Sequence, residues 1–279
     1  MKVLVTGAEG QLGSAVCREI GRNAVGINRK DLDITDELAT SAYIKKLRPD
    51  AIVHCAAYTY VDRAEAEPEL CHAVNSKGTR NIAKATKNID AKMLYVSTDY
   101  IFDGMLDRPY ETEDTPGPLS TYGRTKLEGE YAVQDILDEY FIVRTSWVYG
   151  ADGGNFVKTM LRLGRERGRV SVVADQIGSP TYTRDLANLI SLMIRSEEYG
   201  IYHATNEGFC SWYEFACEIF RSANMDIQVD PLKTSEYPTA AVRPKNSRLS
   251  KRSLTDSGFP RLPSWQQSLK EYVTTSLAK

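Results

Sequence analysis

The first twenty residues place a short apolar strand, a glycine-rich turn and an amphipathic helix in direct succession, and this order restricts the fold most. Residues 3–5 are apolar, Gly7, Gly10 and Gly13 fall as Gly-x-x-Gly-x-x-Gly, and residues 11–20 have helical periodicity. In such a turn the first glycine permits the bend, the second lets a pyrophosphate approach the backbone, and the third lets helix and strand pack closely. The positive end of the helix dipole then faces the phosphates. The motif predicts dinucleotide binding, and a glycine-rich turn without a ligand is the alternative.

The same alternation of strand and helix continues to about residue 150. Continuous apolar strands between helices imply a parallel sheet covered on both faces. Right-handed crossovers then make it a doubly wound α/β domain of the Rossmann type. The pattern predicts further strands at 24–27, 51–55, 93–97 and 141–144, and helices at 37–47, 74–87 and 122–135.

Beyond residue 150 the pattern is less regular. It predicts helices at 156–167 and 183–194, a strand at 170–174, and loop structure over 231–250. Capping boxes at Ser211 and Ser264 predict two more helices. We expect an NAD(P)-binding domain over 1–150 with a return segment at about 170–195, and a smaller substrate-binding part formed by about 151–169 and 196–279.

Composition excludes several classes of protein. The 279 residues carry a net charge of -2, so nothing favours nucleic acid or an acidic membrane as a partner. No apolar run is long enough to span a bilayer, and the strand that starts at residue 2 leaves no room for a signal peptide. Five cysteines without Cys-x-x-Cys spacing suggest reduced thiols in the cytoplasm. No residue cluster has the spacing of a zinc site.

Tyr122 and Lys126 lie four residues apart, which places them on one face of a helix. A tyrosine has an ordinary pKa of about 10, and a neighbouring ammonium lowers that value. Such a pair can exchange a proton with a carbonyl or alcohol oxygen. With 16 tyrosines in the chain, chance alone could supply this spacing, so the interpretation depends on the surrounding residues.

The end of the second strand predicts which cofactor binds. An acidic residue there would bind the adenosine ribose and select NAD, but this chain has Asn28 and Arg29. Arg29 could meet a 2′-phosphate, which favours NADPH, whereas a solvated basic turn is the alternative. Asp33 could still serve the adenine or ribose, so NADH stays open.

Polar or small residues also close the third and fourth strands. Ala56 and Ala57 would let a cofactor lie against the backbone, while His54, without a carboxylate partner, reads as a buried structural histidine. Thr98 lies at the carboxyl end of a strand, where open α/β sheets bind ligands, and it could donate to a substrate carbonyl. A turn cap is its alternative role. Trp147 could form an apolar wall for a substrate ring, with core packing as the rival.

Taken in order, these residues resemble the extended short-chain dehydrogenase/reductase family. A narrower resemblance, to the members that reduce 4-keto sugars attached to dTDP, rests on the segments 97–104, 122–130, 144–150, 175–181 and 243–249. It implies the last step of dTDP-L-rhamnose synthesis, in which NAD(P)H reduces the C4 keto group of dTDP-4-dehydro-L-rhamnose. It also implies a Mg²⁺ at a dimer contact in some members, whose ligands cannot be placed here, so metal and homodimer stay open.

The resemblance further implies a role for each site residue. Tyr122 would be the general acid, Lys126 would bind the nicotinamide ribose and lower the pKa of Tyr122, and Thr98 would orient the keto oxygen. Arg243 is the candidate for the diphosphate, because a cation is needed there. Thr98, Asp99, Tyr100, Trp147 and Arg243 would bind substrate. The cofactor set is Gly7, Gly10, Gln11, Leu12, Gly13, Arg29, Asp33, Ile34, Cys55, Ala56, Ala57, Tyr58, Tyr122 and Lys126.

Two rival functions remain. An epimerase or dehydratase of the same family would keep its NAD, and a dehydratase would need a Glu that the segment 98–100 does not supply. A non-catalytic relative, associated with methionine adenosyltransferase, keeps the nucleotide fold. Thr98, Tyr122, Lys126 and Arg243 argue against that regulatory role.

Overall fold

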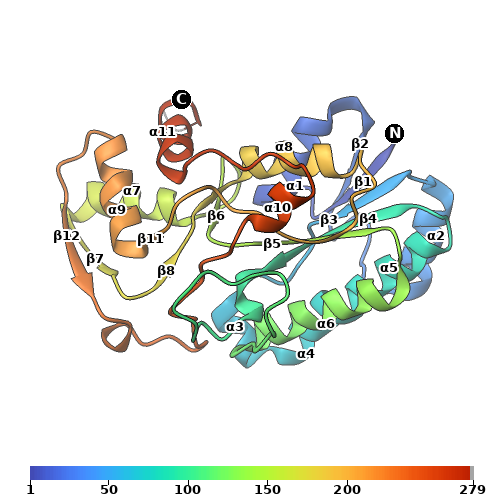
Figure 1. The fold of residues 1–279 in the computed structure, drawn as a ribbon, viewed down its shortest axis with the longest axis horizontal. Helices are drawn as coiled ribbons and strands as arrows, with labels where there is room; N and C mark the ends of the chain where they lie inside the picture. The colour runs from blue at the N-terminus through green and yellow to red at the C-terminus, as the bar shows by residue number, and fades with distance from the viewer. Residues whose placement is uncertain (277–279) are drawn as a thin grey trace.

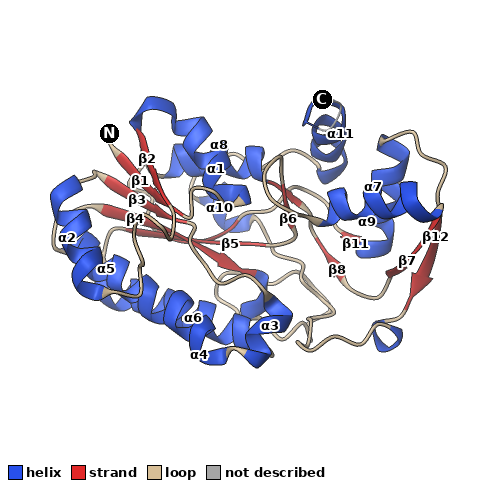
Figure 2. Ribbon diagram, turned by 180° about the vertical axis from the view of Figure 1, so that it is seen from behind, coloured by secondary structure: helices blue, strands red, loops and turns tan. Residues whose placement is uncertain are grey.

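A six-stranded parallel sheet forms the centre of the larger part in the computed structural model, which describes residues 1–276. Its strand order is β10–β5–β4–β3–β1–β2. The chain passes from β1 outward to β2 and then returns to β3 on the other side of β1 (Figure 2). Ligands of open α/β sheets bind at such a reversal. The strands are β1 (Val3–Thr6), β2 (Ala24–Ile27), β3 (Ala51–His54), β4 (Lys92–Thr98), β5 (Tyr140–Thr145) and β10 (Gly200–His203).

Helices cover both faces of this sheet, as the doubly wound prediction requires (Figure 1). One face carries α1 (Gln11–Ile20) and α8 (Thr183–Met193), which pack on each other. The other carries α2 (Glu37–Leu47), α5 (Thr79–Lys87) and α6 (Thr121–Ile136).

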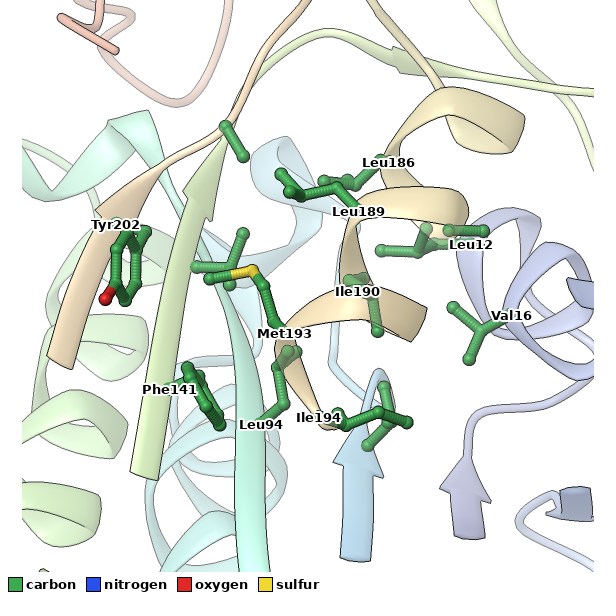
Figure 3. Close-up of a cluster of buried hydrophobic side chains, with 14 of the residues drawn as sticks. Leu12, Val16, Leu94, Phe141, Leu186, Leu189, Ile190, Met193, Ile194 and Tyr202 are labelled. Carbon is green, nitrogen blue, oxygen red and sulfur yellow. The ribbon is translucent and has the colours of Figure 1, made fainter. Parts of the chain in front are cut away.

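The strands read as apolar runs because both faces are buried. Figure 3 shows the cluster under α1 and α8, where Leu12 and Val16 meet Leu186 and Ile190. On the other face, Ile44 and Ile82 pack against Ile52 of β3. The α/β prediction is therefore confirmed.

The smaller part is built around a second apolar cluster. In it α7 (Phe156–Arg167) and α9 (Trp212–Ser222) pack on the parallel pair β7 (Arg169–Val173) and β12 (Gln228–Leu232), and α11 (Trp265–Ser276) packs on α9. The remaining elements are β6 (Val148–Tyr149), β8 (Ile177–Gly178), β9 (Thr181–Tyr182), β11 (Cys210–Ser211), α3 (Val61–Ala66), α4 (Pro68–His72), α10 (Arg252–Asp256), the 3₁₀ turns η1 (Gly21–Asn23), η3 (Asp99–Ile101) and η4 (Thr234–Glu236), and the π-helical turn η2 (Ala73–Gly78).

Two details differ from what the sequence suggests, whereas the predicted capping box at the start of α9 is present. β7 lies inside the expected return segment but pairs with β12, whereas α8 and β10 join the large sheet. β12 extends to Leu232, into the predicted loop, because Pro231 concealed a short edge strand. The capping box at Ser211 is complete, with Glu214 reciprocating. The division into domains stays a prediction.

Two buried histidines predict how stability depends on pH. His54 and His203 are fully buried, and burial lowers the pKa of each from 6.5 to about 3. Below pH 6.5 the unfolded chain binds two protons that the folded chain does not, so stability falls as the pH drops. Asp99 has the opposite effect on stability between pH 3.8 and about pH 6, because burial raises its pKa. This single group offsets only part of the effect of the two histidines.

We therefore expect the urea midpoint of unfolding to fall between pH 7 and pH 5, a window above most carboxylate titrations. Each histidine contributes up to about 2 kcal/mol over this range. His203→Gln should remove roughly half of the pH dependence. An unchanged slope in that variant would show that these imidazoles are not the titrating groups.

Candidate active site

The glycine turn between β1 and α1 has the geometry that the sequence suggests. Gly7 has φ +68°, and a Cβ there would lie 2.8 Å from the backbone nitrogen of Ala56. A Cβ on Gly13 would overlap the Gly7 carbonyl. A Cβ on Gly10 would approach one atom, the Gly7 oxygen, at 3.1 Å. Gly7 and Gly13 thus serve packing, while Gly10 leaves backbone N–H groups of the helix start open to a phosphate.

The other cofactor candidates divide into surface groups and core groups. Arg29 is largely exposed and lies 4.0 Å from the carboxylate of Asp33, whose pKa is lowered by hydrogen bonds from Thr35. Gln11 accepts a hydrogen bond from Asn155 at 3.3 Å. The side chains of Leu12 and Ile34 are buried in the two clusters of the large part. A cofactor could therefore contact Leu12 and Ile34 only through their backbone or the edges of their side chains.

Residues after β3 are fixed by Asn75, which sequence reasoning missed. Asn75 lies in the π-helical turn, accepts from the backbone N–H of Tyr58 at 2.7 Å and donates to the Tyr58 carbonyl at 3.1 Å. It also donates to Thr125 on α6. Such π turns often occur at functional sites. Asn75 thereby ties the Cys55–Tyr58 segment to the helix that carries Tyr122. Burial raises the pKa of the Cys55 thiol to about 12.

Thr98, Asp99, Tyr100 and Tyr122 come together at the carboxyl end of β4. The Tyr122 hydroxyl adjoins the Thr98 side chain, whose hydrogen bonding favours a lower pKa of the phenol, and the rings of Tyr100 and Tyr122 meet edge to face with centroids 5.6 Å apart. Thr98 donates to Asp99 at 3.0 Å and accepts from the Tyr100 N–H, so it also caps η3. The cap role that the sequence left as an alternative is therefore present beside the tyrosine contact. Burial raises the pKa of Asp99 to about 6.

Lys126 is almost fully buried one helical turn after Tyr122. Its Nζ donates to the Val96 carbonyl at 2.6 Å and lies 4.1 Å from the centre of the Tyr95 ring. Burial lowers its pKa to about 7, an effect that Glu130 opposes. Within residues 1–276 no carboxylate forms an ion pair with it.

The expected effect of Lys126 on Tyr122 is not seen. The pKa of Tyr122 is raised, chiefly because the phenol is buried, and only its hydrogen bond with Thr98 opposes this. Lys126 instead directs its ammonium group at the Val96 carbonyl. In this arrangement Tyr122 keeps its proton near neutral pH, as a proton donor must.

Trp147 and Arg243 reach the site from the smaller part. Trp147 has a left-handed backbone (φ +49°), and its indole stacks on Trp212 with centroids 3.6 Å apart. Arg243 forms a bidentate pair with Asp62 on α3, at 2.7 and 3.1 Å. Asp62 also accepts from the Ala241 N–H at 3.1 Å. Asp62, 181 residues from Arg243, has no signal in the sequence that would connect the two.

Ser247 joins the two parts at the site. Its hydroxyl donates to the second carboxylate oxygen of Asp99 at 2.6 Å, and both residues are buried. Ser247 belongs to the segment 243–249, which contributes to the family resemblance. The sequence therefore pointed to this segment but did not indicate that Ser247 contacts Asp99. The contact places that segment against the end of β4.

A buried ion pair lies directly behind the site. Glu130 on α6 and Arg144 on β5 pair at 2.8 Å, and both side chains are nearly inaccessible to solvent. Ser97 donates to Glu130 at 2.5 Å, and Arg144 donates to the Thr112 carbonyl at 3.0 Å. The pair thus connects β4, β5 and α6 immediately below Thr98.

Other features do not enlarge the site. A cavity of about 590 Å³ between α9 and β12 shares none of its lining with these residues. The described residues 1–276 hold no group of three or more His, Cys, Asp or Glu side chains placed for a metal ion. Over the same residues, every helix is too short or too polar to cross a bilayer.

Comparison with known proteins decides the family. The model of the family described as RmlD substrate binding domain matches residues 1–277. The chain belongs to this family. A relative of the RmlD family from Mycolicibacterium smegmatis, named dTDP-4-dehydrorhamnose reductase, is 41% identical over 280 residues, covering 98% of this chain and 85% of that protein. A Streptomyces niveus relative, named dTDP-4-keto-6-deoxy-D-glucose reductase, is 39% identical and covers 96% of this chain and 95% of its own length.

A solved structure of an RmlD relative shares the whole fold. The dTDP-4-dehydrorhamnose reductase of Bacillus anthracis, crystallised in complex with NADP, is 46% identical with a TM-score of 0.96. The match covers 98% of this chain and 99% of that one. The resemblance inferred from the motifs is therefore confirmed.

Proposed function

We propose that this chain reduces the C4 keto group of dTDP-4-dehydro-L-rhamnose to give dTDP-L-rhamnose, with NADPH as the preferred reductant. The observation that carries the proposal is the contact between Thr98 and Tyr122 at the carboxyl end of β4. Two hydroxyl groups meet there, on the same sheet edge as the glycine turn and two strands away from it. The full-length identity to reductases of dTDP sugars supports this reading.

Proton delivery falls to Tyr122 and Thr98. The raised pKa of Tyr122 keeps the phenol protonated, so it can donate a proton to the oxygen that gains charge. Thr98 would hold that oxygen by a second hydrogen bond, for which its single O–H would turn from Asp99 to the substrate. When bound, NADPH supplies the hydride for the carbonyl carbon.

Lys126 is proposed to hold the nicotinamide ribose. An ammonium group has three N–H donors, and one is occupied by the Val96 carbonyl. The other two can donate to ribose hydroxyls. Gly10 and the start of α1 would take the pyrophosphate, because the glycine leaves the backbone accessible there.

Substrate recognition is proposed to combine Arg243, Asp99, Tyr100 and Trp147. A guanidinium has five N–H donors, and Asp62 and the Ala241 carbonyl accept from Nη1 and from one N–H of Nη2, which leaves Nε–H and the other Nη2–H. Arg243 can therefore meet a diphosphate while Asp62 holds it in place. Asp99 and Tyr100 adjoin Tyr122 and would contact the sugar.

The direct test follows NADPH absorbance with dTDP-4-dehydro-L-rhamnose and, separately, with dTDP-4-keto-6-deoxy-D-glucose. Rapid oxidation with the first sugar and slow oxidation with the second is the expected result. The reverse preference would assign the activity named for the Streptomyces niveus relative. The proposal would be overturned if neither sugar caused oxidation of NADPH or, in a parallel assay, of NADH.

Arg29 gives a separate prediction for the cofactor. If its exposed guanidinium meets the 2′-phosphate, Arg29→Ala should raise the KM for NADPH about 10- to 100-fold, as expected for loss of a hydrogen bond to a charged group. The KM for NADH should change little, since NADH lacks that phosphate. Equal effects on both cofactors would instead indicate a general role of this turn.

A further inference from the structure

The backbone of Trp147 is held in a conformation that a non-glycine residue seldom adopts. Its φ of +49° lies in the left-handed region, which is unfavourable for a residue with a side chain. The Trp147 carbonyl accepts from the Thr181 N–H at 3.2 Å, which fixes the peptide at the start of β6. The indole packs against the apolar cluster of the smaller part, whose groups determine its orientation.

Trp212 supplies the largest of those neighbours. The two indoles are nearly parallel, with 14° between their planes and 3.6 Å between their centroids. Trp212 is the first residue of α9, whose start is fixed by the capping box of Ser211 and Glu214. On its other side Trp212 contacts the Phe156 ring, with centroids 4.6 Å apart. The stack is therefore anchored in the core of the smaller part.

The edge of the Trp147 indole lies beside the candidate site. A Cβ built on Gly178 would be 2.7 Å from the indole and 3.1 Å from the Ser247 Cβ, so all three residues are in close contact. Ser247 in turn donates to Asp99, next to Thr98. Any side chain at position 178 would displace the indole. The orientation of this ring is thus coupled to the space where a sugar would lie.

We propose that Trp212 is a positioning residue, which fixes the Trp147 indole as the apolar wall of the sugar site. This inference rests on the proposed function of Trp147. A stacked aromatic pair shifts an equilibrium roughly 2- to 10-fold beyond the effect of its buried area, which favours one indole orientation. Without the stack, part of the free energy of substrate binding would be used to order the Trp147 ring, so the affinity for the sugar would be lower.

The test is a double-mutant cycle of Trp147→Ala and Trp212→Ala, assayed with the keto sugar. Trp212→Ala should raise the KM for the sugar about 2- to 10-fold, with little change in kcat or in the KM for NADPH. Trp212→Phe should restore most of the affinity, because a ring again supports the indole. The double variant should bind no more weakly than Trp147→Ala alone. Additive losses would overturn the inference.

A spectroscopic measurement separates positioning from general damage. The chain has three tryptophans, and only Trp147 and Trp212 are stacked. Exciton coupling between them should give a circular dichroism couplet that either alanine variant removes and Trp265→Phe keeps. A couplet that survives Trp212→Ala would overturn the inference. An unchanged KM for the sugar in Trp147→Ala would refute the role of Trp147 as the wall of the sugar site. A raised KM in Trp147→Ala together with an unchanged KM in Trp212→Ala would refute only the positioning role of Trp212.

Discussion

Tyr122→Phe should lower kcat by about 10²- to 10⁴-fold, the usual contribution of a general acid. The substitution removes one oxygen and leaves the ring, so the edge-to-face contact with Tyr100 is preserved. The hydrogen bond with Thr98 is lost, together with the proton that the keto oxygen needs. The measurement is the steady-state rate of NADPH oxidation with the keto sugar at saturation.

The matching control is cofactor affinity. NADPH binding to Tyr122→Phe, followed by fluorescence, should stay close to the original, since Gly10 and Arg29 lie elsewhere on the sheet edge. Thr98→Val, which removes the second hydroxyl and keeps the shape, should have a smaller effect on kcat. Near-normal turnover by folded Tyr122→Phe would refute the acid assignment.

Arg144→Met should lower the free energy of unfolding by about 3–5 kcal/mol, because it leaves the Glu130 carboxylate buried without its partner. Both side chains are almost wholly inaccessible, so water cannot take over the role of the guanidinium. The Thr112 carbonyl loses its donor as well. Urea unfolding monitored by circular dichroism measures the change.

A second variant separates unpaired charge from lost packing. Glu130→Gln in the Arg144→Met background removes the charge, while the amide oxygen can still accept from Ser97. This double variant should recover much of the lost stability, as uncharged replacements of buried pairs often do. A double variant no more stable than Arg144→Met would show that packing, not the isolated charge, causes the loss.

Local sequence patterns were sufficient to predict the large sheet and the glycine turn. Strands β1, β3, β4 and β5 are buried on both faces and therefore read as apolar runs, and the turn needs glycine at Gly7 and Gly13 for reasons of backbone geometry. Thr98 and Tyr122 could be assigned to one site because strand ends and following helices meet at one sheet edge.

Contacts between distant segments could not be predicted in this way. Asp62 and Arg243 are far apart in the sequence, and neither residue type indicates its partner. The burial of Lys126 and Tyr122 also depends on the folded surroundings, which is why the direction of the tyrosine pKa was wrong from the sequence. Desolvation is a property of the whole site rather than of a motif.

The position of β10 late in the chain limits how this protein can be divided into fragments. β10 pairs with the outer edge of β5, and α8 covers Leu94 and Phe141, although both elements follow α7 and β7 of the smaller part in the chain. A fragment that ends near residue 150 would keep the glycine turn and Tyr122 but leave β5 as an exposed, apolar edge strand. Such edges recruit other chains and aggregate. The nucleotide-binding half is therefore not an autonomous module, and ribosomal synthesis must pass residue 203 before its sheet can close.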